Sequence, residues 1–497
     1  MKYLAIDLGS SFLKGAVLNL DRCRCESVVR VPTPARLPDM PAGHYELSPA
    51  ALCEAISSLL DQLLEAAPDA EGLMMCTQMH GMVLVDDFGM ARSNAITWQD
   101  QRGAPYVEWL LDRLPPSLIA DLGNELRPGV PITTLACLNA EGCLPSQDLQ
   151  VVSLPDFVLA QFSGQRAIVD PTNAASYGLF NVRTGVWSEQ ALAAADLERF
   201  RMPKVVTGDE ALQPCYRFSH RGKILNCPAP VGDHQCALLG SLLREDELSV
   251  NASTGSQISV LSRDFQVGPH QVRPFFDGRF LHAVTHIPAG RALNVLMGLL
   301  TELPNREESP LADPWKLVQY AVDEIPDTDL TVDLSFFNNG RRSQHGSLTN
   351  IREDNLTVGH LFRAAFASMA SDYQRHAASL PSISDGKEAA NQWHRLVFSG
   401  GIAHKVPALR KMIENTFGIP SRLSPTEDDT LNGLLILALR ASGRVASFDE
   451  GMSQVNLTEI EGFSKRLTDT LSPSIQWPEL ISNCWSTLLP ETQRRPD

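Results

Sequence analysis

The chain contains the same strand–turn–strand pattern twice, roughly half a chain apart. Residues 2–18 read as an apolar strand, a Gly-Ser-Ser turn at residues 9–11 and a second strand. Residues 248–261 repeat this plan around a Ser-Thr-Gly turn at residues 253–255. Such a repeat is expected when one supersecondary unit has been duplicated into two lobes. Glycine lets the backbone approach a phosphate and Ser or Thr supply donors, so two facing turns would hold a nucleotide tail.

Strands and helices alternate along both halves of the chain, which predicts an α/β layered fold. The charged residues 244–246 mark the boundary between an N-terminal lobe, residues 1–245, and a C-terminal lobe, residues 246–497. The expected strands include residues 3–8, 12–20, 26–31, 72–76, 82–85, 94–98 and 395–398. The expected helices include residues 49–67, 236–243, 356–377, 407–417 and 429–441, with a polar loop at 382–391.

Composition narrows the class of protein. The 497 residues carry a net charge of -16, which argues against nucleic acid and anionic membranes as partners, because both require clustered Lys and Arg. Ten cysteines are scattered without a C-x2-C pair, which favours reduced thiols in a cytoplasmic protein. Asp7 interrupts the first apolar run, and no apolar stretch approaches the ~18 residues of a membrane span, so neither a signal peptide nor a transmembrane helix is expected.

Two aspartates stand at positions that suit phosphate chemistry. Asp7 closes the first strand, where a carboxylate would repel a bare phosphate unless Mg²⁺ bridged the two. The alternative is an Asp that only caps the turn. Asp233 lies between Gly232 and His234, directly before a helix of small residues, which is a suitable place for a general base. It would also serve as the helix N-cap, and both roles are compatible.

Two polar clusters follow predicted strands, where α/β sheets bind ligands. Residues 78–81 read Gln-Met-His-Gly, and residues 98–102 read Trp-Gln-Asp-Gln-Arg. An aromatic face with donors and acceptors suits a polyhydroxylated ligand, because each hydroxyl both donates and accepts. The alternatives are a structural histidine in the first cluster and a buried tryptophan with surface charges in the second.

Other catalytic patterns do not fit this sequence. Ser11 and Lys14 match S-x-x-K, but no S-D-N or K-T-G accompanies them. There is no Walker A loop and no G-x-S-x-G. His282 and His286 are four residues apart but lack the glutamate of H-E-x-x-H, so they do not indicate a metal site.

Together these residues resemble the FGGY carbohydrate kinases, which belong to the actin/Hsp70-like ATPase superfamily, over nearly the whole chain. Residues 7–14 are similar to the first phosphate motif of that family, and residues 253–255 to the second. Residues 399–403 resemble its adenosine turn, residues 429–435 its late helix, and Asp233 matches its general base. Ser10, Phe12 and Ser253 differ from the residues usual in these motifs.

The resemblance implies a two-lobed actin/Hsp70-like ATPase fold with duplicated ribonuclease-H-like domains and a central cleft. It implies an enzyme that uses ATP and Mg²⁺ to phosphorylate the terminal primary hydroxyl of a ketose, with Asp233 as catalytic base and Asp7 and Asp233 as metal ligands. The implied nucleotide-binding residues are Asp7, Gly9, Ser10, Ser11, Lys14, Thr254, Gly255, Gly400, Gly401 and Ala403. The implied sugar-binding residues are Gln78, Met79, His80, Trp98, Asp100 and Arg102.

Within the family, five segments favour sedoheptulose as the sugar, with sedoheptulose 7-phosphate as the product: residues 97–102, 232–236, 251–257, 273–278 and 346–351. Residues 78–81 are shared with the xylulose kinases, so D-xylulose or another pentulose or polyol is the alternative. A chaperone or actin-like ATPase would lack the sugar cluster. A catalytically inactive sugar or nucleotide sensor is the remaining alternative, because of the departures at Ser10, Phe12 and Ser253. The implied partners are the sugar and MgATP, with a possible homodimer.

Overall fold

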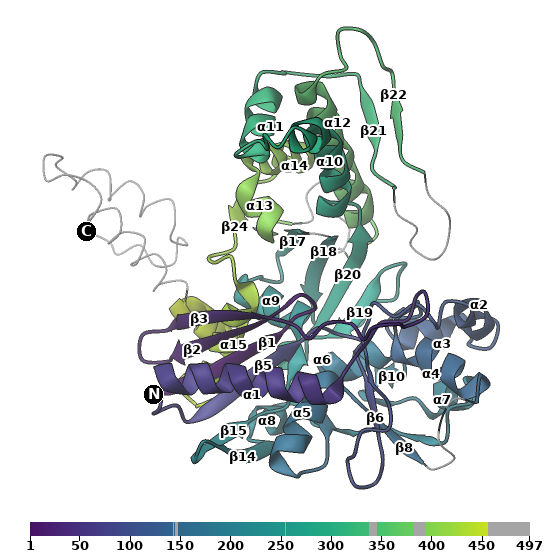
Figure 1. Cartoon of the computed structure of the whole chain (residues 1–497), viewed down its shortest axis with the longest axis vertical. Helices are drawn as coiled ribbons and strands as arrows, with labels where there is room; N and C mark the ends of the chain where they lie inside the picture. Colours follow the sequence, from purple (N-terminus) through teal and green to yellow (C-terminus); the bar gives the residue numbers. More distant parts are fainter. Residues whose placement is uncertain (143, 145–147, 254, 337–344, 382–392, 456–497) are drawn as a thin grey trace, which may run out of the picture.

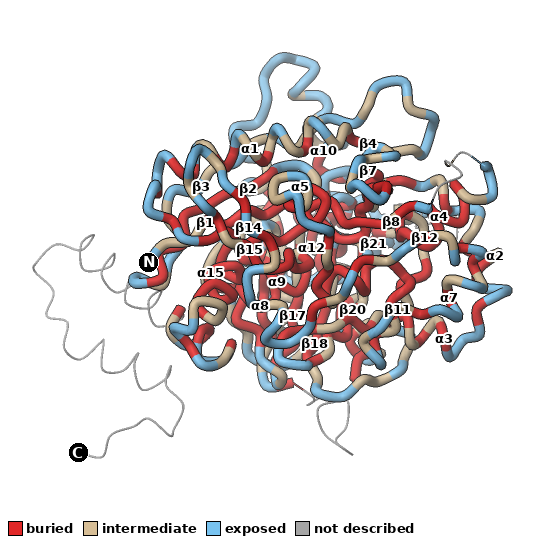
Figure 2. The backbone as a smooth tube through the Cα atoms, turned by 90° about the horizontal axis from the view of Figure 1, so that it is seen from below, coloured by how far each residue is buried: buried red, intermediate tan, exposed pale blue. Residues whose placement is uncertain are grey.

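The computed structural model describes residues 1–142, 144, 148–253, 255–336, 345–381 and 393–455. These residues form two main β-sheets, one in each half of the chain, with helices packed on them (Figure 1). The α/β class predicted from the alternation of strands and helices is confirmed. Buried residues run through both sheets and through the helices between them (Figure 2).

The first sheet belongs to the N-terminal half and has seven strands within the described residues. β1 (Lys2–Leu8) forms an antiparallel hairpin with β2 (Phe12–Asn19) and runs parallel to β5 (Gly72–Thr77). β16 (Val231–Gly232) also runs parallel to β5. The carboxyl ends of these three parallel strands therefore meet at one edge of the sheet. The remaining strands are β3 (Arg24–Pro32), β14 (Tyr216–His220) and β15 (Lys223–Cys227).

The second sheet repeats this arrangement in the C-terminal half. β17 (Glu247–Ala252) is antiparallel to β18 (Ser256–Ser262) and parallel to β23 (Arg395–Ser399). Each sheet therefore places a small-residue turn after a strand that has one antiparallel and one parallel neighbour, as expected of a duplicated unit. The other strands of this sheet are β19 (Gln271–Pro274), β20 (Phe280–Ile287) and β24 (Ser421–Leu423).

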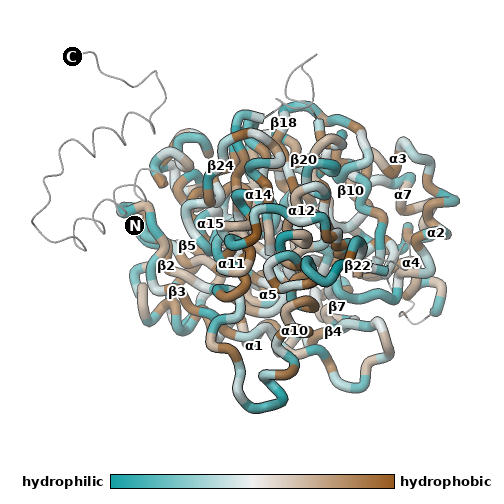
Figure 3. Tube along the Cα trace, turned by 90° about the horizontal axis from the view of Figure 1, so that it is seen from above, coloured by the Kyte–Doolittle hydropathy of each residue, from teal (hydrophilic) through white to brown (hydrophobic). Residues whose placement is uncertain are grey.

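Helices cover the sheets. In the N-terminal half, α1 (Pro49–Ala66) and α5 (Leu154–Ser163) bury their apolar residues against the first sheet. α1 begins where its sequence predicts, because the Ser48 side chain accepts a hydrogen bond from the Ala51 N–H at 3.3 Å. In the other half, four helices lie together on the side seen in Figure 3: α10 (Gly290–Arg306), α11 (Pro314–Asp323), α12 (Val358–Ala377) and α14 (Pro407–Phe417).

A pair of helices packs between the two sheets. α9 (Asp233–Gly240) follows β16, and α15 (Asp429–Ala441) comes from the C-terminal half. The two helices cross closely, because a Cβ added at Gly433 would lie 2.0 Å from the Cys236 carbonyl oxygen. Their apolar residues form one core with residues from both sheets. α15 thus packs against both halves of the molecule. The lobe boundary predicted at residue 245 stays a proposal.

Short elements complete the fold. Those beside the first sheet are β4 (Glu46–Leu47), β6 (Val83–Val85), β7 (Ala95–Ile96), α2 (Tyr106–Leu111), α3 (Pro116–Asp121), α4 (Pro131–Ala140), β8 (Leu149–Val152), β9 (Ile168–Val169), α6 (Pro171–Ala174), β10 (Phe180–Asn181), β11 (Val186–Trp187), α7 (Glu189–Ala194), β12 (Phe200–Arg201), β13 (Lys204–Val205) and α8 (Asp209–Leu212). Those of the C-terminal half are β21 (Thr331–Asp333), β22 (Ser347–Thr349) and α13 (Gly401–Lys405).

Most predicted elements agree with the structure to within one or two residues at each end, and two predicted elements need correction. The helix expected at 236–243 begins at Asp233, because Gly232 takes the extended cap position, and it ends at Gly240. The strand expected at 94–98 is confined to β7, because the chain turns where the Asp100 N–H bonds the Thr97 carbonyl. The loop expected at 382–391 and the tail from residue 456 lie outside the described residues. Among the helices that are described, none has the length and hydropathy that crossing a membrane requires.

Candidate active site

Three predicted site segments meet at the carboxyl edge of the first sheet. Leu8, at the end of β1, pairs with Thr77 at the end of β5, and Gly232 of β16 pairs with the same Thr77. The first turn, the cluster at residues 78–81 and Asp233 are therefore neighbours, because each directly follows one of these parallel strands. The ends of β17 and β23 bring together the second turn and the turn at residues 399–403, which is predicted to bind adenosine, in the same way.

Asp233 is the first residue of α9 and retains partial solvent exposure. Burial, then the negative charge of Asp7, raises the pKa of its carboxyl to about 7, while the hydrogen bond from the His234 N–H and the charge of Arg273 oppose this rise. A general base works best when its pKa lies near the working pH. The structure thus gives Asp233 the proton affinity that a base needs near neutral pH.

The first turn is connected to the predicted sugar-binding residues through Ser10. Its hydroxyl lies 3.1 Å from Gln78 Oε1, to which it donates, and accepts a hydrogen bond from Trp98 Nε1 at 2.8 Å. Gly9 is required by the tight turn, because a Cβ there would lie 2.7 Å from the Phe12 carbonyl oxygen. Ser11 is exposed beside it. The predicted phosphate turn and two predicted sugar residues therefore form one hydrogen-bonded unit.

Asp7 lies under the first turn and is 5% exposed. Its Oδ2 accepts a hydrogen bond from Thr430 Oγ1 at 2.7 Å and lies 3.8 Å from Lys14 Nζ. Lys14 also pairs with Asp428 at 3.2 Å. Burial raises the pKa of Asp7, and Lys14 counteracts this rise. A carboxylate with raised pKa, close to the second carboxylate of Asp233, is an arrangement that a bound cation would stabilise.

The second turn and the predicted adenosine turn are held against each other. Asn251 Nδ2 donates to Ser399 Oγ at 3.0 Å, and Ser253 Oγ donates to Asn251 Oδ1 at 2.9 Å. Gly400 has φ +85°, and a Cβ there would lie 2.6 Å from the Ala252 carbonyl oxygen, so this close approach needs glycine. Of the other predicted nucleotide residues, Gly255 and Gly401 are exposed, Ala403 is buried, and Thr254 lies outside the described residues.

His80 has the positive φ of +71°, which is uncommon for a residue other than glycine. Its Nε2 lies 3.3 Å from Glu125 Oε2 and 3.1 Å from Arg127 Nη2. Burial, then the charge of Arg127, lowers the pKa of His80 to about 4, so the ring is neutral at pH 7. Met79, beside it, has its Sδ 3.6 Å from Arg273 Nη1.

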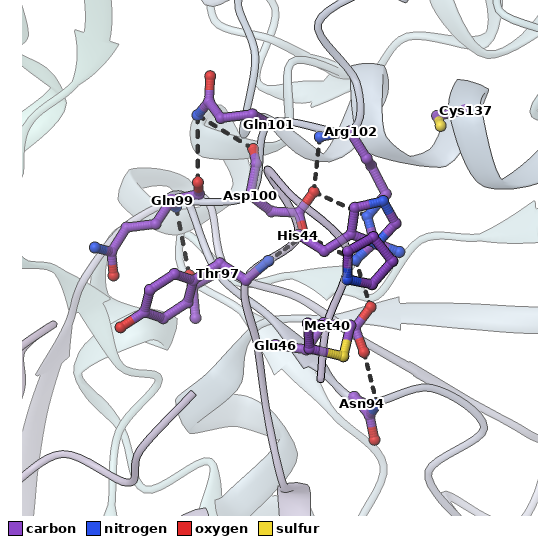
Figure 4. A network of polar contacts seen from close by, with 12 residues as sticks. Met40, His44, Glu46, Asn94, Thr97, Gln99, Asp100, Gln101, Arg102 and Cys137 are labelled. Atoms are coloured by element: carbon purple, nitrogen blue, oxygen red, sulfur yellow. Dashed lines mark hydrogen bonds and ion pairs between the residues drawn. The ribbon is translucent and has the colours of Figure 1, made fainter. Parts of the chain in front are cut away.

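Asp100 and Arg102 do not join this group. Asp100 is fully buried, and Arg102 and the Tyr45 N–H use both of its carboxylate oxygens (Figure 4). Arg102 also bonds Glu46. His44, Glu46 and Asp100 place ligand atoms within 4.8 Å of one another, but the Arg102 guanidinium already forms ion pairs with both carboxylates. Asp100 and Arg102 follow Trp98 closely in the chain. Their hydrogen bonds therefore fix the turn that carries Trp98.

The structure adds charged residues that the sequence patterns did not single out as site residues. Glu125 is fully buried and accepts a hydrogen bond from Arg273 Nε at 2.5 Å. Arg273 Nη1 lies 2.9 Å from His234 Nδ1, next to Asp233. Arg127 approaches Glu125 at 3.6 Å. Arg273 had a sequence signal, since it begins the segment 273–278, whereas nothing in the local sequence marks Glu125 or Arg127.

Comparisons with known proteins identify the family. Residues 2–240 match the N-terminal domain of the FGGY family of carbohydrate kinases. The sedoheptulokinase of Mus musculus is 22% identical over 88% of this chain and 97% of its own length. The xylulose kinase of Escherichia coli (strain K12) is 29% identical over 42% of this chain and 43% of its own. The ligand-bound xylulose kinase from Lactobacillus acidophilus is 16% identical and superposes with a TM-score of 0.77, covering 95% of this chain and 99% of its own.

The fold and these matches define a sugar kinase with the actin/Hsp70-like ATPase fold, as the sequence resemblance implies. Residues 2–240, nearly half of the chain, form an N-terminal domain of the FGGY family of carbohydrate kinases. Its substrates are therefore a sugar and the phosphate donor ATP, which the family uses.

Proposed function

We propose that this enzyme transfers the γ-phosphoryl group of ATP to the terminal primary hydroxyl of a ketose. Sedoheptulose is the proposed sugar and sedoheptulose 7-phosphate the product. The similarity to a sedoheptulokinase along nearly the whole chain supports this choice, because it spans both halves. D-xylulose is the second candidate, supported by the 29% identity of the xylulose kinase over its shorter match.

The observation that carries the proposal is the position of Asp233. Its carboxylate is partly exposed, has a pKa of about 7 and neighbours both the first turn and the residues at 78–80. We assign it the role of general base, which takes the proton from the attacking hydroxyl. Since phosphoryl transfer depends mainly on alignment and charge neutralisation, this base contributes about 10²–10⁴-fold to the rate.

The nucleotide would be held by the two turns and the adenosine turn, through the ten residues named from the sequence. The phosphates would contact Gly9, Ser10 and Ser11 of the first turn and Thr254 and Gly255 of the second. Gly400, Gly401 and Ala403 would contact the adenosine. Lys14, already paired with Asp7 and Asp428, supplies positive charge beside the first turn.

Mg²⁺ is the proposed metal, and the donor set fits it. Asp7 and Asp233 offer carboxylate oxygens, which Mg²⁺ prefers, and each carries a raised pKa that a cation would relieve. When bound with ATP, Mg²⁺ neutralises charge on the phosphates. Asp233 would serve both as metal ligand and as base, while Asp7 is held in place by Thr430.

The sugar would contact Gln78, Met79, His80 and Trp98. Trp98 keeps part of its surface exposed, and its ring nitrogen is already bonded to Ser10, so its ring would supply an apolar face. Asp100 and Arg102 were expected to contact the sugar directly. Because both are bonded within the chain, we propose that they support the Trp98 turn instead.

The test is ADP release with MgATP and sedoheptulose, D-xylulose, D-ribulose, L-ribulose, glycerol or no sugar. Strong stimulation by sedoheptulose alone supports the proposal, and stimulation by a pentulose moves the substrate to the second candidate. ATP binding without turnover of any sugar favours the inactive sensor. That alternative is supported by Ser10, Phe12 and Ser253, which differ from the residues usual in the phosphate motifs. A homodimer and a cytoplasmic location are also proposals, which sedimentation velocity and cell fractionation would test.

A further inference from the structure

A cluster of buried charges next to the sugar residues carries more positive than negative charge. Glu125, Arg127 and Arg273 form its centre, and none of the three side chains is more than 19% exposed. Burial would raise the pKa of Glu125, but Arg273, then His80 and Arg127, hold it well below its usual value. The nearby histidines have lowered pKa values and are neutral at pH 7. Two guanidiniums therefore face the Glu125 carboxylate, and Arg273 also acts on the carboxylate of Asp233.

Arg127 is the member of this cluster with unused donors. Its Nε is buried and makes no hydrogen bond among the described residues, since its approach to Glu125 is 3.6 Å. Its Nη2 shares His80 Nε2 with Glu125. A neutral His80 can donate from Nε2 to Glu125 or accept there from Arg127, but not both. Glu125 is also held by Arg273 and by Gln271 Nε2 at 3.4 Å, and its 3.6 Å ion pair with Arg127 leaves the Arg127 Nε donor without a hydrogen bond.

Among the described residues, Arg127 is linked to Asp233 through other side chains and forms no hydrogen bond or ion pair with it. Arg273 bridges Glu125 to His234, the neighbour of Asp233, so three linked side chains separate Arg127 from the base. Arg127 also contacts His80, a proposed sugar residue. A sugar that reaches from Asp233 to His80 would thus present its other end to Arg127.

A guanidinium donates hydrogen bonds and accepts none. A hydroxyl is matched best by a partner that both donates and accepts, whereas a carbonyl or carboxylate oxygen only accepts. We propose that Arg127 determines substrate specificity by binding an oxygen of this kind, a keto carbonyl or a carboxylate, at the end of the sugar opposite the transferred phosphoryl group. This inference rests on the proposed function, because it assumes that a sugar occupies the site beside Asp233.

Steady-state ADP release by Arg127→Gln tests the inference, with Arg217→Gln as matched control. Arg217 is exposed on β14, at the edge of the first sheet. The substrates are sedoheptulose and D-xylulose as ketoses, D-gluconate as a carboxylate, and xylitol and glycerol as polyols. We expect Arg127→Gln to raise KM for the ketose or carboxylate about 10- to 100-fold with kcat changed less than about threefold, while KM for the polyols stays the same. Arg217→Gln should match the wild type.

The bound oxygen can belong to a keto carbonyl or to a carboxylate. The substrate with the larger increase in KM in Arg127→Gln, the ketose or D-gluconate, shows which of the two it is. The proposal is overturned if KM rises equally for the ketose and the polyols, or if KM does not rise at all. Should Arg127→Gln not fold, Arg127→Lys keeps the charge, loses the planar fork and should still raise KM for the keto or carboxylate substrate. If the wild type turns over no sugar, calorimetry can measure the binding of sedoheptulose and D-gluconate to the wild type and the variant, which tests Arg127 separately from the proposed activity. The role of Arg127 is overturned if both proteins bind these sugars equally. It is also overturned if the wild type binds neither sugar.

Discussion

Asp233 combines two properties at a single residue, partial exposure and a pKa near neutrality. We expect Asp233→Asn to lower kcat about 10²–10⁴-fold, because the amide keeps the shape but accepts no proton. Calorimetry should still detect ATP binding. In the wild type, kcat/KM for the sugar should fall as the pH is lowered below about 7, since the base works only when deprotonated and bound Mg²⁺ would lower its pKa from that value. A profile that stays flat from pH 4.5 to 8 would contradict this role.

Protonation of a single residue, Asp156 in α5, makes the free energy of unfolding depend on pH. It is fully buried, and its carboxyl meets Ser153 Oγ at 2.5 Å and the Tyr216 hydroxyl at 3.2 Å. Burial raises its pKa to about 8, with these hydrogen bonds opposing the shift. The folded protein therefore keeps a proton on Asp156 that the unfolded chain loses near pH 4. The contribution of this proton to the free energy of unfolding is complete below pH 4 and is lost as the pH rises to about 8.

We expect the melting temperature of the wild type to fall more steeply than that of Asp156→Asn between pH 5 and 8.5. The loss for one proton is on the order of 1.4 kcal/mol per pH unit within that window. The amide resembles the protonated acid, so the variant should gain stability relative to the wild type as the pH rises. Parallel melting curves across this pH range would refute the assignment. Thermal unfolding followed by circular dichroism at several pH values provides the measurement.

At the scale of elements, the α9–α15 crossing depends on glycine. A Cβ at Gly433 would lie 2.0 Å from a backbone oxygen of α9, which cannot move aside as a side chain would. We expect Gly433→Ala to lower the free energy of unfolding by about 1–3 kcal/mol, as overpacking does. Urea unfolding would measure this loss.

Gly298→Ala is the matched control. Gly298 also lies within a helix, α10, but a Cβ there would meet nothing within 4 Å. Alanine is the better helix former by about 1 kcal/mol, so this variant should be as stable as the wild type or more so. Equal losses in both variants would mean that the crossing itself is not the cause.

At the scale of the whole molecule, Arg273 connects the two halves. It lies on β19 of the second sheet and pairs with the buried Glu125 and with His234 of the N-terminal half. We expect Arg273→Leu to destabilise the protein by about 3–5 kcal/mol, because it leaves the Glu125 charge buried with weaker compensation. Double replacement of Glu125 and Arg273 by leucine should recover part of the loss in urea unfolding. Additive losses would show that the two residues do not stabilise each other.

Local signals in the sequence predicted much of the fold. Ser48 and Pro49 mark the start of α1, and the helices at 407–417 and 429–441 have the predicted bounds. These features depend on neighbours within a few residues, so a single segment carries the information. The duplicated turn plan and the strand that precedes each turn were readable for the same reason.

The site was only partly readable. Residues at the ends of parallel strands, such as Asp7, Gln78 and Asp233, could be placed together because a sheet aligns such ends. Asp100 looked like a sugar ligand, yet Arg102 and Tyr45 bond both of its oxygens. Which partner a buried charge finds depends on the path of distant chain segments.

The sequence by itself determined the chemical groups at the strand ends, the duplicated strand–turn–strand plan and the resemblance to the FGGY kinases. Only the tertiary structure decided the environment of those groups. Glu125 and Arg273 are 148 residues apart, and their contact arises from the packing of β19 against the N-terminal half. Local patterns report propensities of neighbouring residues, whereas the pairing of buried charges is settled by desolvation, which exists only once the chain has closed around them.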